Sequence, residues 1–193
     1  MRYLQWYPAE ADVSNRPGWY HHPGQQPKPA ARLLSLYEQS VGRNASLLLN
    51  VPPARDGRID EADIRELTAF GKAVRGIYGT DLNAAEPGPR TFDRVGLGED
   101  IRNGRRVEKF TVEARAGGEW RRIASRTTIG HRRIPALSEP VTADKVRVTV
   151  RQSRATPHLK PVTLHLARTP LAGGGPHLAG DQGGRPGGPV AGR

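Results

Sequence analysis

The stretch SVGRNASLLLNVPPARDG, residues 40–57, holds a short apolar run between two groups of chain-breaking residues. Leucines occupy positions 47–49, so a strand here is apolar on both of its faces. Such strands are typical of the interior of a parallel sheet that helices cover on both sides. The prolines at 52–53 end the strand, and a turn follows at 56–57. We therefore predict a strand over residues 46–51 in an α/β fold.

Helical patterns flank this strand. Residues 30–41 place apolar side chains at helical spacing, and a second helix begins at Asp60, where Glu61 and Asp63 in the first turn complement the helix dipole. One parallel strand with two helices leaves backbone donors unpaired, because parallel neighbours require crossovers of a dozen or more residues. We therefore interpret residues 1–83 as the last βα units of a larger sheet or (β/α)8-like barrel, which is an incomplete domain.

Residues 91–168 have the pattern of short antiparallel strands. Valines at 146, 148 and 150 alternate with polar residues, and Gly117-Gly118 predicts a hairpin whose return strand begins at Trp120. Such strands favour an antiparallel β-sandwich of the jelly-roll, galactose-binding-like type. We expect Trp120 to belong to its core. The predicted architecture is therefore α/β plus all-β.

Composition narrows the function classes. The 193 residues contain no cysteine, which excludes disulfides, zinc–thiolate sites and a thiol nucleophile. No apolar run is long enough for a membrane helix. The net charge of +11 comes almost entirely from residues 84–193, where arginine dominates. Arginines at outward strand positions explain this charge as a solvated surface, so we expect no nucleic-acid partner. Proline and glycine mark a linker at 84–90 and a disordered tail at 169–193.

The opening stretch WYPAEADVSNRPGWYHHP, residues 6–23, has no periodicity and is predicted to be a loop. It nevertheless concentrates tryptophans, tyrosines, carboxylates, histidines and an arginine. Aromatic faces beside charged groups suit a sugar, whose C–H face stacks while its hydroxyls form hydrogen bonds. The alternative is that the two tryptophans anchor the loop by packing and that Arg16 pairs only with Glu10 or Asp12. We favour the functional interpretation for the cluster as a whole.

Other polar residues receive structural interpretations. Adjacent His21 and His22 do not direct both rings at one ion, so we predict a hydrogen-bonding or surface role and no metal site. Asn44 begins a glycosylation sequon that runs directly into the predicted strand, which makes the asparagine inaccessible. Asn50 closes that strand, at the end where an α/β barrel carries its active site, and we favour a role in capping backbone groups.

These stretches resemble a known family. Residues 6–23 and 40–71 closely resemble α-L-fucosidases of glycoside hydrolase family 29, and are nearest to the bacterial subgroup that prefers fucose on branched, Lewis-type glycans. Residues 92–134, FDRVGLGEDIRNGRRVEKFTVEARAGGEWRRIASRTTIGHRRI, resemble the C-terminal β-sandwich of the same proteins. The resemblance covers residues 3–167. Asn15 departs from it, because the family usually has a β-branched apolar residue there, and we expect looser packing behind the loop.

The resemblance implies a retaining hydrolase with an Asp nucleophile and a Glu acid/base, about 5–5.5 Å apart. The nucleophile lies before the matched region, and the acid/base also precedes the WYPAE motif, although Glu10 remains a catalytic candidate. The implied contacts to substrate are stacking by Trp19 and hydrogen bonds from charged side chains. The proposed substrate-binding set is Trp6, Glu10, Asp12, Arg16 and Trp19.

The family further implies a fucosylated glycan as substrate, no cofactor and export from the cell. Without the nucleophile, we expect the isolated chain to be inactive. The first alternative is a carbohydrate-binding β-sandwich with residues 1–83 as a vestigial stub. The second is nucleic-acid binding through the arginine-rich half, which predicts an affinity that falls steeply with salt.

Overall fold

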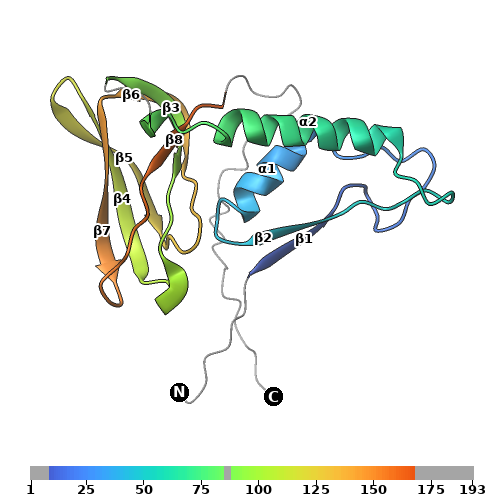
Figure 1. The fold of residues 1–193 in the computed structure, drawn as a ribbon, viewed down its shortest axis with the longest axis horizontal. Coiled ribbons are helices and arrows are strands. Elements are labelled where there is room, and N and C mark those ends of the chain that lie inside the picture. The colour runs from blue at the N-terminus through green and yellow to red at the C-terminus, as the bar shows by residue number, and fades with distance from the viewer. Residues whose placement is uncertain (1–8, 85–87, 168–193) are drawn as a thin grey trace, which may run out of the picture.

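A computed structural model describes residues 9–84 and 88–167, which form two lobes (Figure 1). The α/β lobe comprises residues 9–84, and the β lobe comprises residues 88–167. Trp6 and the predicted tail at 169–193 lie outside the described residues. None of the helices in the two described ranges has the length and apolar character needed to cross a membrane.

The α/β lobe has the order β1 (Glu10–Ser14), α1 (Ala30–Ser40), β2 (Ser46–Asn50), α2 (Glu61–Tyr78) and the 3-10 turn η1 (Leu82–Ala84). The two strands run parallel, with Glu10 opposite Ser46 and Ser14 opposite Asn50. The parallel strand predicted at 46–51 and both predicted helices are therefore confirmed. The prediction that residues 6–23 form a loop throughout is wrong, because the backbone of 10–14 pairs with β2.

One face of this two-stranded sheet is open. Helix α1 lies against the other face (Figure 1). On the open face, Asp12 stands opposite Leu48, and the leucine is 50% exposed. The described residues therefore leave one face of this strand without a helix. Glu10 is exposed on the same face, two residues before Asp12.

The β lobe contains two antiparallel three-stranded sheets, in the orders β6-β3-β8 and β5-β4-β7. Its elements are β3 (Arg90–Gly96), η2 (Ile101–Asn103), β4 (Val107–Ala116), β5 (Glu119–Thr127), β6 (Ala136–Ala143), β7 (Lys145–Ser153) and β8 (Thr163–His165). Alternate apolar side chains meet between the sheets, among them Phe92, Val95, Phe110, Val112 and Leu164. The antiparallel sandwich and the hairpin at Gly117-Gly118 are confirmed. The strands β3 and β6 were not predicted.

Trp120 is a correction to the predicted core. Its side chain is 37% exposed on the outer face of β5-β4-β7, with the Arg147 guanidinium 4.1 Å from its ring centroid. The cause is a register shift in the β4–β5 pair: Val112 pairs with Ala124, whereas Glu113 pairs with Arg122. One extra residue in β5 reverses the alternation, because a shift of one position moves a side chain to the opposite face.

Polar contacts connect the lobes. The Glu38 carboxylate of α1 accepts hydrogen bonds from Arg94 Nε of β3 at 2.8 Å and from the Tyr78 hydroxyl of α2 at 2.6 Å. Burial, followed by the charge of Glu38, raises the pKa of Tyr78. Asn44 Oδ1 accepts from the backbone N–H of His131 at 2.6 Å. The half-buried Asn44 amide therefore joins the two lobes across the interface.

Replacing Tyr78 with phenylalanine tests this interface. The Tyr78→Phe variant keeps the ring but removes a donor to a charged acceptor, so we expect the free energy of unfolding to fall by about 1–2 kcal/mol in urea titrations. Tyr37→Phe is the matched control: its ring centroid lies 5.7 Å from that of Tyr78, and its hydroxyl has no hydrogen bond within the described residues. Equal losses in the two variants would contradict the role of the Glu38 contact.

Candidate functional site

The loop over residues 15–29 leaves the carboxyl end of β1, and its base is fixed by backbone contacts. Asn15 N–H donates to the Asn50 carbonyl at 2.8 Å, and Lys28 N–H donates to the Asn15 carbonyl at 2.7 Å. The Lys28 ammonium also donates to the Ser14 carbonyl at 2.6 Å. The two ends of the loop therefore meet beside the carboxyl ends of both strands.

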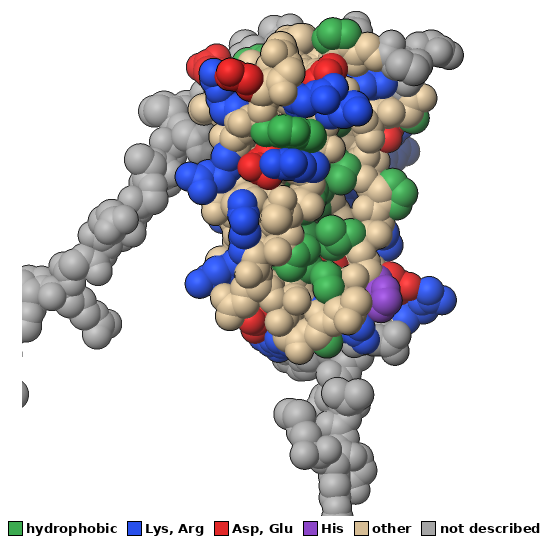
Figure 2. Space-filling view, turned by 90° about the vertical axis from the view of Figure 1, so that its left-hand side faces the viewer, with side chains coloured by type: hydrophobic (Ala, Val, Ile, Leu, Met, Phe, Trp, Pro, Cys, Tyr) green, Lys and Arg blue, Asp and Glu red, His purple; other side chains and the backbone are tan. Residues whose placement is uncertain are grey.

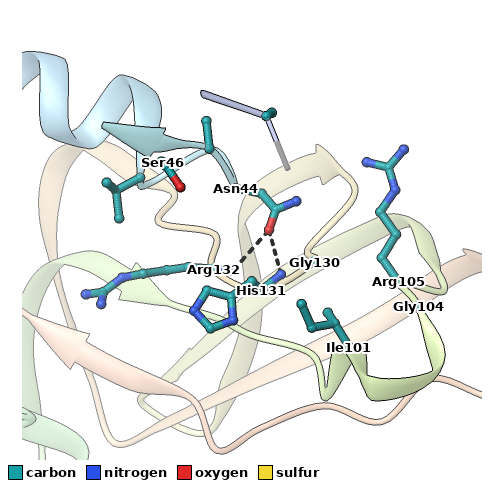
Figure 3. A pocket seen from close by; sticks show the side chains of 11 residues that line it. Asn44, Ser46, Ile101, Gly104, Arg105, Gly130, His131 and Arg132 are labelled. Atoms are coloured by element: carbon teal, nitrogen blue, oxygen red, sulfur yellow. Dashed lines mark hydrogen bonds between the residues drawn. The ribbon is translucent and has the colours of Figure 1, made fainter. Parts of the chain in front are cut away.

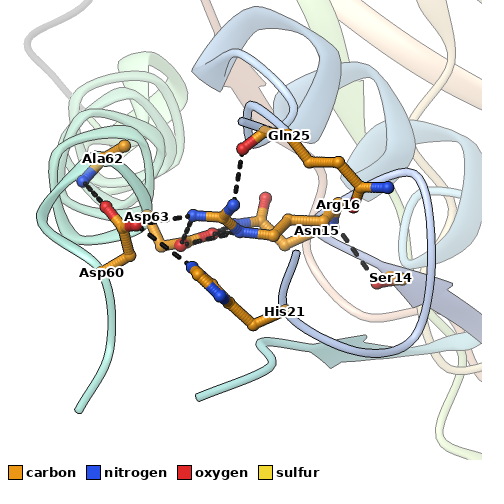
Figure 4. Close-up of polar contacts among 8 residues, drawn as sticks. All are labelled: Ser14, Asn15, Arg16, His21, Gln25, Asp60, Ala62 and Asp63. Carbon is orange, nitrogen blue, oxygen red and sulfur yellow. Dashed lines mark hydrogen bonds and ion pairs between the residues drawn. The ribbon is translucent and has the colours of Figure 1, made fainter. Parts of the chain in front are cut away.

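A buried ion pair holds the inside of the loop (Figure 4). Arg16 Nη2 lies 2.5 Å from Asp63 Oδ2, and Nε donates to the same carboxylate at 3.0 and 3.2 Å. Arg16 is 2% exposed and Asp63 is fully buried. The remaining guanidinium nitrogen, Nη1, donates to the Gln25 carbonyl at 2.5 Å. The hydrogen bond with Asp63 raises the pKa of Arg16, so the guanidinium stays charged.

Asp60 extends this network at the start of α2. Its Oδ1 accepts from the Ala62 N–H at 2.9 Å as the helix N-cap. Its Oδ2 lies 3.2 Å from His21 Nε2 and 3.3 Å from Arg16 Nη2. The Ala62 N–H, followed by His21 and Arg16, lowers the pKa of Asp60. The hydrogen-bonding role predicted for His21 is confirmed.

Asn15 is fully buried next to this ion pair. Its Nδ2 donates to Asp63 Oδ1 at 2.7 Å, whereas its Oδ1 has no partner within the described residues. The looser packing expected from the departure at this position stays a prediction. Asn15 adds a third point at which Asp63 holds the segment that follows β1.

Trp19 and Tyr20 lie on the exposed side of the loop. The Trp19 side chain is 53% exposed, although its carbonyl accepts a hydrogen bond from Asn50 Nδ2 at 3.0 Å. The Ser14 hydroxyl donates to the Gly18 carbonyl at 2.5 Å and accepts from Asn50 Nδ2 at 3.2 Å. The capping role predicted for Asn50 is confirmed. These contacts fix the backbone at Trp19 and leave its ring accessible.

The residues predicted as a site occupy different environments. Glu10 and Asp12 lie on the open face of β1, Glu10 at the amino end of the strand opposite Ser46, whereas Trp19 is exposed on the loop that follows the carboxyl end. Arg16 instead pairs with Asp63 and Asp60, so the alternative pairing with Glu10 or Asp12 is wrong. Sequence reasoning missed the role of Asp63, which it assigned only to the helix dipole. The available signal was an acidic residue at a position of the first turn that faces the body of the lobe.

A cavity of about 740 Å³ lies between the lobes, near the amino end of β2 (Figure 3). It is therefore at the opposite end of that strand from Trp19. Its described lining includes the basic side chains Arg105, His131 and Arg132. Ala9, the first described residue, forms part of the wall. None of the described residues predicted as a sugar site lines this cavity. Within the same described ranges, no group of three or more acidic or histidine side chains is arranged to hold a metal ion.

Comparisons with known proteins bear on this arrangement. No family model matches the chain. Alpha-L-fucosidase 1 of Arabidopsis thaliana is 30% identical over 83% of this chain and 41% of the plant protein. A glycoside hydrolase 29 family member from an unknown rumen bacterium is 35% identical, with a TM-score of 0.77, over 92% of this chain and 35% of that one. The Ruminococcus gnavus GH29 fucosidase in complex with fucose is 25% identical, with a TM-score of 0.77, over 86% of this chain and 42% of that one.

The solved structures that this chain is similar to thus include glycoside hydrolases of family 29, and its curated relatives are alpha-L-fucosidases. The resemblance to α-L-fucosidases drawn from residues 6–23, 40–71 and 92–134 is confirmed over most of the chain. The chain spans about two fifths of the length of the curated relatives it matches.

The buried pair can be tested at Asp63. Asp63→Ala leaves the Arg16 charge buried without its partner, so we expect the free energy of unfolding to fall by about 3–5 kcal/mol in urea titrations. Glu61→Ala is the matched control, since it removes an exposed carboxylate from the same helical turn. Replacing both partners, Arg16→Met with Asp63→Leu, is expected to destabilise less than Asp63→Ala alone. Equal effects of the Asp63 and Glu61 variants would contradict this account.

Asp60 provides a dependence on pH. Because its pKa is lowered in the folded chain, ionised Asp60 stabilises the fold above its unfolded pKa of about 4, and this contribution is lost as the pH falls through the lowered value. Asp60→Asn keeps an acceptor for Ala62 but does not titrate. We expect its stability to decline less than that of the parent chain between about pH 5 and pH 2. Asp56→Asn, in the exposed turn before α2, should retain the parent slope.

Proposed function

We propose that the chain is part of a retaining α-L-fucosidase. In this proposal the α/β lobe supplies the closing βα units of a (β/α)8-like barrel, and the β lobe is the accessory sandwich that follows it. The observation that carries the proposal is the open face of β1 and β2, where Leu48 is half exposed beside two carboxylates. A parallel sheet requires cover on both faces and paired edges, and the described residues supply one covered face.

The proposed sugar site lies at the carboxyl ends of β1 and β2, which is the end where barrels of this class place their loops and their chemistry. Trp19 offers an accessible ring on a fixed backbone, which suits stacking on the C–H face of fucose. Asp12, in the middle of β1, offers a carboxylate for the sugar hydroxyls, whereas Glu10 begins the strand opposite Ser46, at the end away from Trp19. Glu10 is kept as the candidate catalytic acid/base from its place in the motif. Trp6 is retained as a sugar contact from its place in the same motif.

Arg16 has a different role in this proposal. Its guanidinium is saturated by Asp63, Asp60 and the Gln25 carbonyl, so it acts on the sugar through the loop that it holds. A displacement of about 1 Å in a stacking or hydrogen-bonding group lowers catalytic rates substantially. We therefore regard Arg16 as a positioning residue for Trp19.

Retaining hydrolysis requires two carboxyl groups on opposite sides of the glycosidic bond. A nucleophilic carboxylate attacks the anomeric carbon as the acid protonates the leaving oxygen, and water then releases fucose from the covalent intermediate. No stretch of this sequence resembles the segment that carries the nucleophile, so the isolated chain should be inactive. The proposed substrate is a glycan with terminal α-linked fucose.

A second candidate function is that of a carbohydrate-binding module on the β lobe, with the α/β lobe as a stub. The partial exposure of Trp120 on the outer face of β5-β4-β7, with Arg147 against its ring, favours this candidate, since an exposed indole can stack on a sugar. Protection of Trp19 by fucose against chemical modification supports the barrel site, whereas protection of Trp120 supports the module.

The test begins with the purified chain and 4-nitrophenyl α-L-fucoside. We expect no release of nitrophenol above the buffer rate. Turnover at ordinary fucosidase rates would contradict the proposal that this sequence does not contain the nucleophile. The matching segment of the Ruminococcus gnavus fucosidase is then replaced by residues 9–167, which should give an active chimera. In it, Glu10→Gln should lower kcat by about 10²–10⁴ if Glu10 is the acid/base, and Trp19→Ala should raise KM about tenfold. Trp120→Ala is the matched control and should change neither.

A further inference from the structure

The outer face of β5-β4-β7 concentrates positive charge around Trp120. We name this surface the basic face and define it by Lys109, Arg115, Trp120, Arg122, Lys145, Arg147 and Arg151. These side chains alternate with the buried core positions of their strands. Figure 2 shows lysine and arginine side chains spread over this face with hydrophobic side chains between them.

The strand register places four cations around the indole. Arg115 of β4 stands opposite Trp120 on one side and Lys145 on the other. In the adjacent row, Glu113 stands between Arg122 and Arg147. Directly opposed residues have neighbouring side chains, so the like charges of Arg115 and Lys145 repel each other across the sheet. Asp144 offsets the charge of Arg115, which leaves Lys145 without an acidic partner among the described residues.

The carboxylates on this face are already paired, which leaves net positive charge. Glu113 accepts from Arg147 Nε at 2.9 Å, and Asp144 pairs with Arg115 Nη2 at 2.6 Å. These arginines lower the pKa values of Glu113 and Asp144, so both acids are ionised at neutral pH. Lys109, Arg122 and Lys145 have no ion pair or side-chain hydrogen bond within the described residues. Three cations thus remain for an external partner.

We propose that the basic face is a docking surface for an anionic oligosaccharide that carries sulfate or carboxylate groups. Guanidinium groups bind such oxyanions through paired hydrogen bonds, and the indole supplies an apolar surface for a sugar ring. Single-stranded nucleic acid fits less well, because it stacks successive bases on several aromatic rings. Within the described part of the β lobe, Trp120 is the one exposed aromatic side chain of large size.

This proposal does not depend on the fucosidase proposal, because the basic face and the carboxyl ends of β1 and β2 belong to different lobes (Figure 1). Loss of binding at one surface leaves the other unchanged. The two proposals therefore fail separately, one in glycan binding by the β lobe and the other in fucoside hydrolysis by the chimera.

The test titrates the full chain with a heparin-derived hexasaccharide and follows tryptophan fluorescence and heat at about 0.1 M salt. Arg122→Gln with Lys145→Gln should weaken binding about fivefold to tenfold, since two exposed cations without an acidic partner are lost. The matched control is Arg58→Gln with Arg65→Gln, which removes the same charge from exposed positions of the α/β lobe and should change the affinity less than twofold. Trp120→Ala should weaken binding about tenfold and abolish the fluorescence change, whereas Trp120→Phe should bind within threefold of the parent chain.

Two further ligands decide the class of partner. Neutral maltohexaose should not compete with the heparin oligosaccharide, and a thymidine oligonucleotide of similar charge should bind at least tenfold more weakly. Equal binding of the oligonucleotide would overturn the assignment to a glycan. Equal weakening by the two double variants would mean that binding depends only on the overall charge of the chain, and this would overturn the assignment to the basic face. An unchanged affinity of Trp120→Ala would overturn it as well.

Discussion

The loop that carries Trp19 depends on one buried charge contact, that of Arg16 with Asp63. Both side chains are out of water, so each charge is tolerated only because the other is present and because hydrogen bonds satisfy the remaining polar atoms. Asp63 also accepts from Asn15, and Asp60, the N-cap of the same helix, contacts His21. The first turn of α2 is therefore the support on which a segment some forty residues earlier in the chain is built.

This constraint explains why a loop with so many aromatic and charged residues has a defined backbone. Loops of this length usually obtain their order from packing or from turns with special backbone angles. Here a guanidinium contacts the helix carboxylate on one side and the Gln25 carbonyl on the other, so it spans the loop internally. The exposed side chains of Trp19 and Tyr20 are consequently not needed to hold the loop in place. That separation of support from exposed aromatic area is what a binding loop on a rigid scaffold requires.

The elements with strong periodicity could be predicted from the sequence, whereas features that depend on contacts with distant segments could not. The leucines of β2, the valines of β7 and the acidic start of α2 each have a local signal, and all three elements form where expected. The polar strand β1 has no such local signal, because the strand forms through backbone pairing with β2. Assigning Trp120 to the core from alternation assumes that the strand register is unbroken. A single extra residue in β5 instead turns the Trp120 side chain to the outer face. Likewise, Arg16 has acidic residues near it in the sequence, but its partner is Asp63 of α2, which lies close only in the folded chain.

The two lobes form a unit in which the candidate surfaces keep a fixed relation. Glu38 receives Arg94 from the β lobe and Tyr78 from α2, and the backbone of Gly42 accepts from Ile134, so side-chain and backbone bonds cross the same interface. The basic face and the carboxyl ends of β1 and β2 lie toward opposite ends of this unit (Figure 1), so a glycan contacts both surfaces only where it spans the molecule. A glycan long enough to contact both surfaces would raise the local concentration of its fucosylated branches at the second site, because both contacts would be made within one complex. The arginines of the β lobe would then contribute to substrate binding, and the carboxylates on the open face of β1 would contact the neutral sugar.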